Sequence, residues 1–206
     1  MTKRKIAILG STGSIGKTLL KIVEKEKTKF DILLLSADKN HNVLLKQAKK
    51  FNVKNLIITD NHSFKILKYK TKHLKIRVYN NYENLDKIFK NKIDYTMSSI
   101  TGIDGLYPTV KIIRFTKKIA IANKESIICG WAIISKELKK NKTEFIPVDS
   151  EHFSLWYGIK GNNKNNIEKI FLTASGGPFY KLPLKNFKNI NIKNALNHPN
   201  WKMGKK

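Results

Sequence analysis

KIAILGSTGSIG, residues 5–16, is the stretch that decides the fold. A short apolar run leads directly into a glycine-rich turn, and an apolar face at three- and four-residue spacing follows from about Ser14 to Lys27. This pattern predicts a strand, a tight turn and a helix. Gly10 permits the turn, Gly13 lets the backbone approach a pyrophosphate, and Gly16 lets the helix pack closely on the sheet. The stretch therefore predicts a dinucleotide site, although a glycine-rich turn without a ligand accounts for the same local structure.

Strand-like and helix-like segments alternate after this opening. Further strands are expected at Phe30–Ser36, Asn55–Thr59, Lys75–Tyr79, Asp94–Ser98, Lys118–Ala122, Glu144–Val148 and Glu168–Thr173. Apolar residues at helical spacing fill most of the intervals between them. Strands that alternate with helices of this length predict an α/β fold with a Rossmann-like, doubly wound parallel sheet.

Positive charge dominates the composition. The 206 residues carry a formal net charge of +26, from 41 Lys and Arg against 15 Asp and Glu. Specific nucleic-acid readers favour arginine for bidentate contacts, but arginine occurs here only at Arg4, Arg77 and Arg114, and the lysines are spread along the chain. Lys, Asn and Ile share A/T-rich codons, so compositional drift explains the excess more simply than a binding site. We therefore expect no specific nucleic-acid partner, and keep a basic polyanion-binding protein as a third hypothesis.

Cysteine use and hydropathy bear on the compartment. Cys129 is the one cysteine, which excludes an intramolecular disulfide and agrees with a reducing compartment. We expect it to be a small buried residue. No apolar run approaches the roughly 18 residues that a membrane span needs, and the first strand begins too early for a signal peptide. The expectation is a cytoplasmic protein with no membrane partner.

The residues after the second predicted strand point to two different cofactors. Asp38 follows the last motif glycine by about 20 residues, where the adenosine ribose is usually bound, and its carboxylate suits a 2′-OH and NAD. Lys39 and the Asn40 amide suit a 2′-phosphate and NADP. A plain strand-to-helix turn, with Asn40 or Asp38 as the cap, explains the same residues without a ligand.

A polar cluster, Asn123 to Ser126, follows the Lys118–Ala122 strand. It is therefore expected at the carboxyl edge of the sheet, where open α/β folds bind ligands. Lys124 can hold an anion there. Helix capping by Asn123 or Ser126, with Glu125 near the positive end of the helix, is the alternative.

A second polar cluster follows the Glu144–Val148 strand and contains two carboxylates. Asp149 and Glu151 can bind a hard cation such as Mg²⁺ or Mn²⁺ together with water, substrate and another carboxylate. The alternative is a helix N-terminus, with Asp149 or Ser150 as the cap and Glu151 in the first turn. His152 fits a packed or supporting role better than direct ligation.

Two glycine-containing motifs lie near the end of the sequence. ASGGPF at 174–179 exposes N–H and hydroxyl donors, which can clamp a phosphate or simply make a tight turn. HPNWKMG at 198–204 places an aromatic and a methionine between His and Gly, a pattern typical of a lid or of an anchored surface loop.

Together, five motifs resemble the 1-deoxy-D-xylulose 5-phosphate reductoisomerase family in order and spacing. They are GSTGSIG at 10–16, ANKES at 122–126, PVDSEH at 147–152, SGGPF at 175–179 and HPNWKMG at 198–204. The resemblance implies an oxidoreductase of non-mevalonate isoprenoid biosynthesis. Such an enzyme rearranges a ketose phosphate and reduces the resulting aldehyde with NADPH to 2-C-methyl-D-erythritol 4-phosphate. The resemblance also implies a divalent cation, Mn²⁺ or Mg²⁺, and a homodimer.

The resemblance further implies a role for each matching residue. Cofactor contacts are expected at Thr12, Gly13, Ser14, Ile15, Lys39, Asn40, Asn123, Glu125 and Gly204. Substrate contacts are expected at Lys124, Ser150, Glu151, Ser175 and His198, of which Lys124, Glu151 and His198 would be catalytic. Asp149 and Glu151 would bind the metal. The implied domains are an NADP-binding Rossmann-like domain at 1–148 and the start of an α+β catalytic domain at 149–206.

The sequence departs from the family pattern in two ways. Family members continue beyond this length with a segment that completes phosphate and metal binding, so we expect a partial catalytic domain and no turnover by these 206 residues alone. A truncated, catalytically inactive protein that at most binds NADP(H) is therefore the alternative function. Asp38 stands where the family usually has a small or polar residue, and its charge opposes the NADP preference.

Overall fold

The computed structural model describes residues 2–163, 166–173 and 177–197. Its contacts divide the chain into two units, residues 1–160 and residues 161–206.

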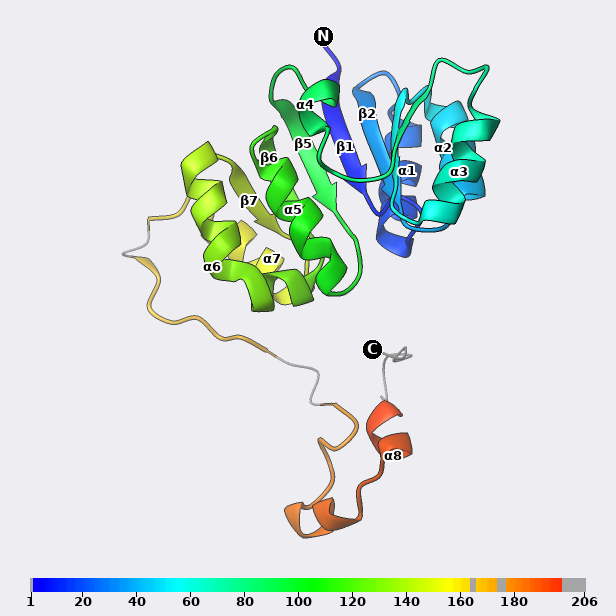
Figure 1. The fold of residues 1–206 in the computed structure, drawn as a ribbon. Coiled ribbons are helices and arrows are strands. Elements are labelled where there is room, and N and C mark those ends of the chain that lie inside the picture. Colours follow the sequence, from blue (N-terminus) through cyan, green and yellow to red (C-terminus); the bar gives the residue numbers. More distant parts are fainter. Residues whose placement is uncertain (1, 164–165, 174–176, 198–206) are drawn as a thin grey trace. The chain divides into compact units, whose positions relative to one another are not determined.

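The first unit is built on one parallel sheet of seven strands in the order β4-β3-β2-β1-β5-β6-β7 (Figure 1). The strands are β1 Arg4–Leu9, β2 Phe30–Ala37, β3 Asn55–Ile58, β4 Arg77–Tyr79, β5 Ile93–Ser98, β6 Thr116–Ile121 and β7 Glu144–Pro147. From β1 the chain builds outward through β2, β3 and β4, and then returns to add β5 on the other side of β1. This reversal between β1 and β5 is the place where open α/β sheets bind ligands. The predicted α/β, doubly wound fold is confirmed.

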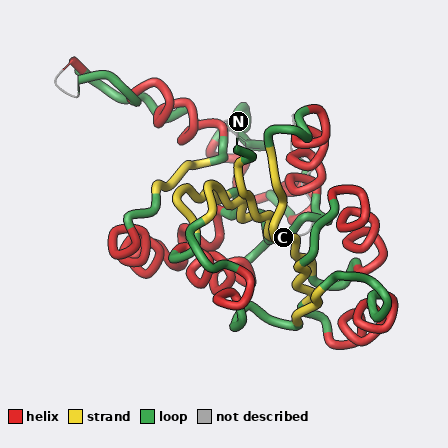
Figure 2. Tube along the Cα trace, turned by 90° about the horizontal axis from the view of Figure 1, so that it is seen from above, coloured by secondary structure: helices red, strands yellow, loops and turns green. Residues whose placement is uncertain are grey.

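Helices cover both faces of the sheet, as the view from above shows (Figure 2). They are α1 Ser14–Lys25, α2 His41–Phe51, α3 Asn61–Lys70, α4 Leu85–Ile88, a 3₁₀ turn Ile103–Gly105 that leads into α5 Leu106–Ile113, α6 Lys124–Asn141 and α7 Ser150–Ile159. None of the helices in the described part of the chain is both long enough and apolar enough to cross a membrane.

Alternation along β1 builds two cores, one on each face of the sheet. Ile6 and Ile8 are buried with residues of α1, α2 and α3, whereas Ala7 and Leu9 are buried with residues of α4, α5 and α6. Successive side chains of a strand point to opposite faces, so a strand covered on both sides is apolar throughout. This explains why the KIAIL run has no polar position after its first residue.

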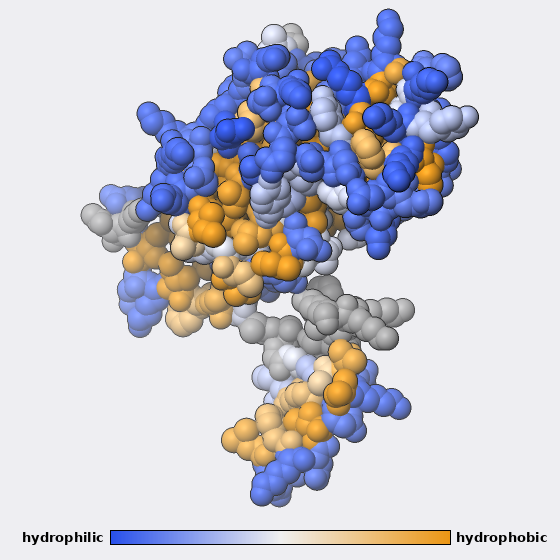
Figure 3. All heavy atoms as spheres, in the orientation of Figure 1, coloured by the Kyte–Doolittle hydropathy of each residue, from blue (hydrophilic) through white to orange (hydrophobic). Residues whose placement is uncertain are grey.

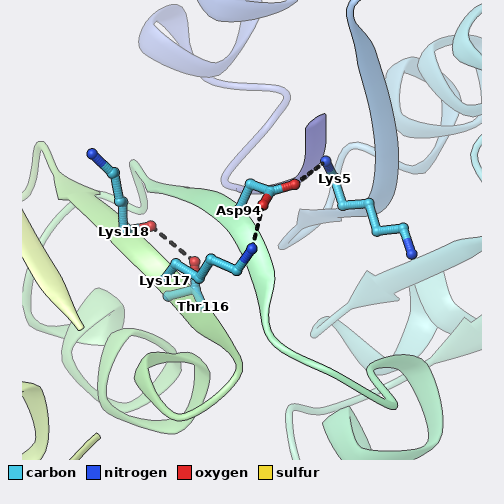
Figure 4. Close-up of polar contacts among 5 residues, drawn as sticks. All are labelled: Lys5, Asp94, Thr116, Lys117 and Lys118. Atoms are coloured by element: carbon cyan, nitrogen blue, oxygen red, sulfur yellow. Dashed lines mark hydrogen bonds and ion pairs between the residues drawn. The ribbon is translucent and has the colours of Figure 1, made fainter. Parts of the chain in front are cut away.

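Asp94 ties three strands together at the amino edge of the sheet (Figure 4). Its Oδ2 accepts a hydrogen bond from the backbone N–H of Lys5 at 2.9 Å, and its Oδ1 lies 2.8 Å from Nζ of Lys117. The hydrogen bond from the Lys117 ammonium, followed by that from the Lys5 backbone, lowers the pKa of the Asp94 carboxyl. The cluster lies at the amino ends of these strands, on the opposite edge of the sheet from the glycine-rich turn. Its role is therefore structural.

Helix α6 carries an exposed apolar face, which differs from the sequence prediction. Cys129 was expected to be buried, but it is exposed, and its neighbour Ile128 is 80% exposed. Trp131 and Ile133 are also exposed, and Figure 3 shows hydrophobic side chains gathered over this helix. The prediction failed because α6 packs through Gly130, Ile134 and Leu138, and Cys129 lies outside this buried stripe.

The second unit contains a 3₁₀ segment, Leu184–Asn189, and a short helix, α8 Ile192–Leu196. The strand predicted at Glu168–Thr173 is wrong, because these residues have no regular secondary structure. Ile170, Phe171 and Leu172 are exposed. A strand needs a paired neighbour to satisfy its backbone groups, and the described residues of this unit offer none.

Candidate functional site

Strand register brings four polar turns to one edge of the sheet. Leu9 pairs with Ser98, Ser98 with Ile121, and Ile121 with Pro147, so β1, β5, β6 and β7 end side by side. The turns that follow these strands contain the glycine-rich motif, Ser99 to Gly102, Asn123 to Glu125, and Asp149 to Glu151. The predicted cofactor, substrate and metal clusters therefore lie along the same carboxyl edge.

Two glycines of the motif are required by close packing. Gly10 has a φ of +77°, and a Cβ built on it would lie 2.7 Å from the carbonyl oxygen of Ser99. A Cβ on Gly16 would lie 2.5 Å from both the Gly10 oxygen and the Ser11 Cα. The first glycine therefore forms the turn and the third brings α1 against it, as the spacing predicts.

The N-terminus of α1 is open to an anion. Gly13 is the N-cap residue, no side chain caps the helix, and the first turn contains no acidic residue. By contrast, α2, α3, α6 and α7 are capped by the side chains of Asn40, Asp60, Asn123 and Asp149. The first N–H groups of a helix need acceptors, and the helix dipole favours a negative one. The uncapped end of α1 therefore suits a phosphate group of a dinucleotide.

A buried hydrogen-bond network fixes the turn below this open helix end. The Tyr82 hydroxyl donates to Ser36 Oγ at 2.8 Å, and Ser36 Oγ accepts the backbone N–H of Gly10 at 3.1 Å. Ser11 Oγ lies 2.8 Å from Gln47 Oε1, and Gln47 Nε2 donates to the Ser11 carbonyl oxygen at 2.9 Å. Burial raises the pKa of Tyr82 far above its usual value, so its hydroxyl stays protonated and remains a donor.

A cavity of about 790 Å³ opens between the turns after β1, β2 and β5. Thr12 and Gly13, both predicted to contact the cofactor, line it. Asp38 and Thr59 line the side next to β2 and β3, and Ile100 to Pro108 contributes most of the wall beyond β5. This volume and its position at the strand reversal suit a dinucleotide.

Sequence reasoning missed the Ile100–Pro108 wall and the supporting network. Tyr82 and Gln47 lie far from the glycine-rich motif in sequence, and nothing in their local pattern indicates that they contact it. Gly102 is a local sequence signal of a special turn before α5, and the structure gives it a φ of +75°.

Asn123 fixes the cavity wall to the neighbouring turn. Its Nδ2 donates to the carbonyl oxygens of Ile100 and Gly102, and its Oδ1 accepts the backbone N–H of Ser126 at 2.8 Å. Asn123 is buried, with 3% of the residue exposed. Asn123 was predicted to bind the cofactor; its amide group here connects the wall to the start of α6 and caps that helix.

Lys124 follows β6 and Asp149 follows β7, and the positive charge of Lys124 interacts electrostatically with the Asp149 carboxyl. Burial would raise the pKa of the Asp149 carboxyl, but hydrogen bonds from His152 and the charges of His152 and Lys124 lower it overall. Asp149 is therefore ionised at neutral pH. An ionised carboxylate beside an exposed lysine can bind a cation on one side and an anionic group on the other.

The oxygen donors of Asp149 and Glu151 fit a hard divalent cation in chemical type. Both residues begin α7, and the Asp149 side chain is 12% exposed. In the described part of the chain, no group of three or more His, Cys, Asp or Glu side chains could hold a metal ion. The pair can supply two carboxylate ligands, so further ligands would come from other groups, substrate or water. Ser175, His198 and Gly204, also predicted site residues, lie outside the described residues.

Comparison with known proteins agrees with this arrangement. The sequence model of the family "1-deoxy-D-xylulose 5-phosphate reductoisomerase" matches residues 6–130, and that of its C-terminal domain matches residues 145–206. The reductoisomerase of Pelagibacter ubique is 60% identical over 205 residues, which cover 98% of this chain and 53% of that protein. The Clostridium kluyveri protein of the same name is 41% identical, covering 98% of this chain and 54% of its own length.

Solved structures give the same match. The Zymomonas mobilis reductoisomerase in complex with NADPH superposes with a TM-score of 0.86 at 30% identity, covering 96% of this chain and 52% of that one. A DOX-P reductoisomerase in complex with NADPH, fosmidomycin and magnesium has a TM-score of 0.79 at 31% identity, with coverages of 98% and 52%. The chain spans about half the length of the curated relatives it matches. It belongs to the 1-deoxy-D-xylulose 5-phosphate reductoisomerase family.

Proposed function

We propose that this chain acts in the NADPH-dependent conversion of 1-deoxy-D-xylulose 5-phosphate to 2-C-methyl-D-erythritol 4-phosphate, a step of non-mevalonate isoprenoid biosynthesis. The observation that carries the proposal is the uncapped N-terminus of α1 at the mouth of a large cavity. Relatives whose complexes contain NADPH and magnesium share this fold at 30% identity or more. The proposal therefore rests on a site as well as on family membership.

The cofactor would lie along the edge of the sheet between β2 and β6. Thr12 and Gly13, with Ser14 and Ile15 in the first turn of α1, would hold its phosphates. Backbone N–H groups can meet the phosphate oxygens there because no side chain caps the helix. Lys39 and Asn40 would lie near the adenosine end, and Asn123, Glu125 and Gly204 near the rest of the cofactor.

The substrate would lie at the ends of β6 and β7. Lys124, Ser150, Glu151, Ser175 and His198 would contact it, and Asp149 and Glu151 would also hold Mn²⁺ or Mg²⁺. A divalent cation, when bound, polarises the ketone and stabilises negative charge that develops on its oxygen. Lys124 would hold the substrate against this end of the sheet through its positive charge, and Lys124, Glu151 and His198 would be the catalytic residues.

The remaining assignments follow from the family and the composition. We place the boundary between the NADP-binding domain and the catalytic part at residues 148 and 149, and we expect a homodimer. The single cysteine suits a reducing compartment, so we propose a cytoplasmic enzyme. The diffuse lysines predict weak, salt-sensitive attraction to polyanions and no specific nucleic-acid complex.

A turnover assay separates this proposal from the alternative, a protein that binds NADP(H) without catalysis. The 206-residue chain is mixed with 1-deoxy-D-xylulose 5-phosphate, NADPH and Mn²⁺, and NADPH oxidation is followed by absorbance. Both hypotheses predict calorimetric binding of NADPH that is tighter than that of NADH, whereas only the proposed function predicts measurable turnover. Turnover that Lys124→Ala abolishes would assign the full reaction to this chain, whereas absence of NADPH binding would refute the cofactor site itself.

A further inference from the structure

The end of β2 presents a carboxylate to the cavity. Asp38 lines the cavity, whereas its neighbours Lys39 and Asn40, both described, are not part of the lining. All three residues are exposed, so burial does not explain the difference.

Thr59 holds Asp38 in place. Ala37 pairs with Ile58, so the residues that follow β2 and β3 leave the sheet together. The Thr59 hydroxyl donates to Asp38 Oδ1 at 2.9 Å, and the backbone N–H of Asp60 donates to the Asp38 carbonyl oxygen at 3.2 Å. Thr59 also lines the cavity. The carboxylate is therefore oriented by a hydrogen bond and has a second oxygen for a ligand.

The two residues that suit a 2′-phosphate are partly engaged elsewhere. Asn40 Oδ1 accepts the backbone N–H of Val43 at 3.2 Å as the cap of α2. Ser63 Oγ donates to the Lys39 carbonyl oxygen at 2.9 Å, which fixes the Lys39 backbone against the start of α3. Hydrogen bonds from Ser63, and to a smaller extent the charge of Lys39, lower the pKa of Asp60, so Lys39 already has an acidic neighbour.

We propose that Asp38 is a specificity-determining residue that accepts a hydrogen bond from the adenosine ribose 2′-OH and narrows the preference for NADPH over NADH. A carboxylate at the end of the second strand suits a ribose diol and repels a 2′-phosphate. The proposal rests on the proposed function, in which this cavity holds a nicotinamide dinucleotide. It predicts that the chain binds both cofactors, with Asp38 favouring one and its neighbours the other.

Charge removal at Asp38 tests the proposal directly. Asp38→Asn keeps an acceptor for Thr59 and removes the negative charge. The matched control is Asp31→Asn, which removes the same charge at the amino end of the same strand, about 20 Å away and beyond the range of a screened charge. Dissociation constants for NADPH and NADH are measured by calorimetry on the wild type and both variants, after circular dichroism has verified folding.

In Asp38→Asn we expect the NADPH dissociation constant to fall about tenfold, because repulsion of the 2′-phosphate is removed. The NADH constant should rise about threefold, since a neutral amide is the weaker acceptor. Asp31→Asn should leave the ratio of the two constants unchanged. Thr59→Val, which keeps the charge but releases the carboxylate, should weaken NADH about threefold and affect NADPH less.

The outcomes separate the two proposals. If both cofactors bind and Asp38→Asn changes their ratio no more than Asp31→Asn does, the specificity role is refuted and the cofactor site stands. If neither NADPH nor NADH binds to the folded wild type, both proposals fall. A gain in NADPH affinity that shrinks with added salt would support repulsion as its cause.

Discussion

The Asp149 carboxylate lies 2.6 Å from Nδ1 of His152, and the same oxygen accepts the backbone N–H of His152 at 3.0 Å. Asp149 is thus the cap of α7, one of the two alternatives that the sequence left open. A cap uses one carboxylate oxygen, which leaves the other for a cation. Capping and metal binding are therefore compatible in one residue, and they can be separated experimentally.

The first prediction separates them by comparing Asp149→Asn with Asp149→Ala. Asparagine caps a helix about as well as aspartate, so Asp149→Asn should keep its stability within about 0.5 kcal/mol, whereas Asp149→Ala should lose about 1 kcal/mol. Both variants should weaken Mn²⁺ binding about tenfold or more, because a neutral group or no group replaces a carboxylate ligand. Urea unfolding gives the stability and calorimetry gives the Mn²⁺ affinity.

Asp60 provides the control for this pair. It caps α3 by accepting the Ser63 backbone N–H at 2.8 Å. It follows β3, which is separated from β7 by four strands in the order of the sheet. Asp60→Ala should lose comparable stability without a change in Mn²⁺ affinity. Wild-type Mn²⁺ affinity in folded Asp149→Asn would remove Asp149 from the metal site.

The second prediction concerns the glycine-rich turn. Gly13 has ordinary extended backbone angles, and a Cβ there would lie 3.4 Å from the Gly10 oxygen, a normal contact. Gly13→Ala should therefore fold with stability within about 0.5 kcal/mol of the wild type. It should nevertheless bind NADPH at least about tenfold more weakly, because the methyl group stands where a phosphate approaches the backbone.

Gly16→Ala is the contrasting variant. Its Cβ would press on the backbone at 2.5 Å, so it should lose about 1–3 kcal/mol in urea unfolding. Normal NADPH affinity in Gly13→Ala would place the phosphates away from this turn. Normal stability in Gly16→Ala would mean that α1 can shift away from the turn without loss.

The sequence predicted the sheet because burial on both faces leaves a strong local signal. Each of the first seven predicted strands is present, with ends that differ by at most a few residues from the predicted ones. The strand at Glu168–Thr173 was wrong because an apolar run shows that a segment can pair, and whether a neighbour is present depends on the rest of the fold. Cys129 was misplaced for a related reason, since the side of α6 that packs is set by Gly130 and the elements around it.

The site was predicted as separate motifs, and the structure adds how they are connected. Local patterns identified the glycine-rich turn with Gly13 and the two later polar clusters as groups at strand ends. No local pattern could predict that Tyr82 supports Gly10 through Ser36, because that contact exists only when three distant segments meet. The same applies to Asn123, which was identified as a polar residue at the sheet edge but whose partners lie about 20 residues earlier.

The third prediction uses the Asn123 amide. In Asn123→Asp the cap acceptor for α6 is kept, but an oxygen replaces the nitrogen that donates to Ile100 and to Gly102, the latter at 2.6 Å. Two partly buried carbonyl groups then lose their donor and face a negative charge, which should cost about 2 kcal/mol. NADPH binding should weaken as well, because these residues belong to or adjoin the cavity wall.

Asn40→Asp is the matched control for stability. It makes the same change at the cap of α2, where the acceptor is retained and a negative charge favours the helix N-terminus. Its stability should stay within about 0.5 kcal/mol of the wild type. Equal losses in the two variants would show that the Asn123 amide nitrogen has no special role in holding the wall.

The last prediction concerns stability at high pH and the Tyr95 hydroxyl. Burial raises the pKa of Tyr95 to about 12, whereas a tyrosine in the unfolded chain ionises near pH 10. Between these two values the unfolded state releases a proton that the folded state retains, so stability falls as pH rises from about 10 to about 12. At pH 11 this loss of stability amounts to about 1.4 kcal/mol relative to pH 8.

Tyr95→Phe lacks the ionising hydroxyl and should lose about 1.4 kcal/mol less stability than the wild type between pH 8 and pH 11 in urea unfolding. Tyr69→Phe is the control, since Tyr69 is 81% exposed, and it should follow the wild type. Parallel losses in the wild type and Tyr95→Phe would mean that the Tyr95 hydroxyl reaches solvent when it ionises.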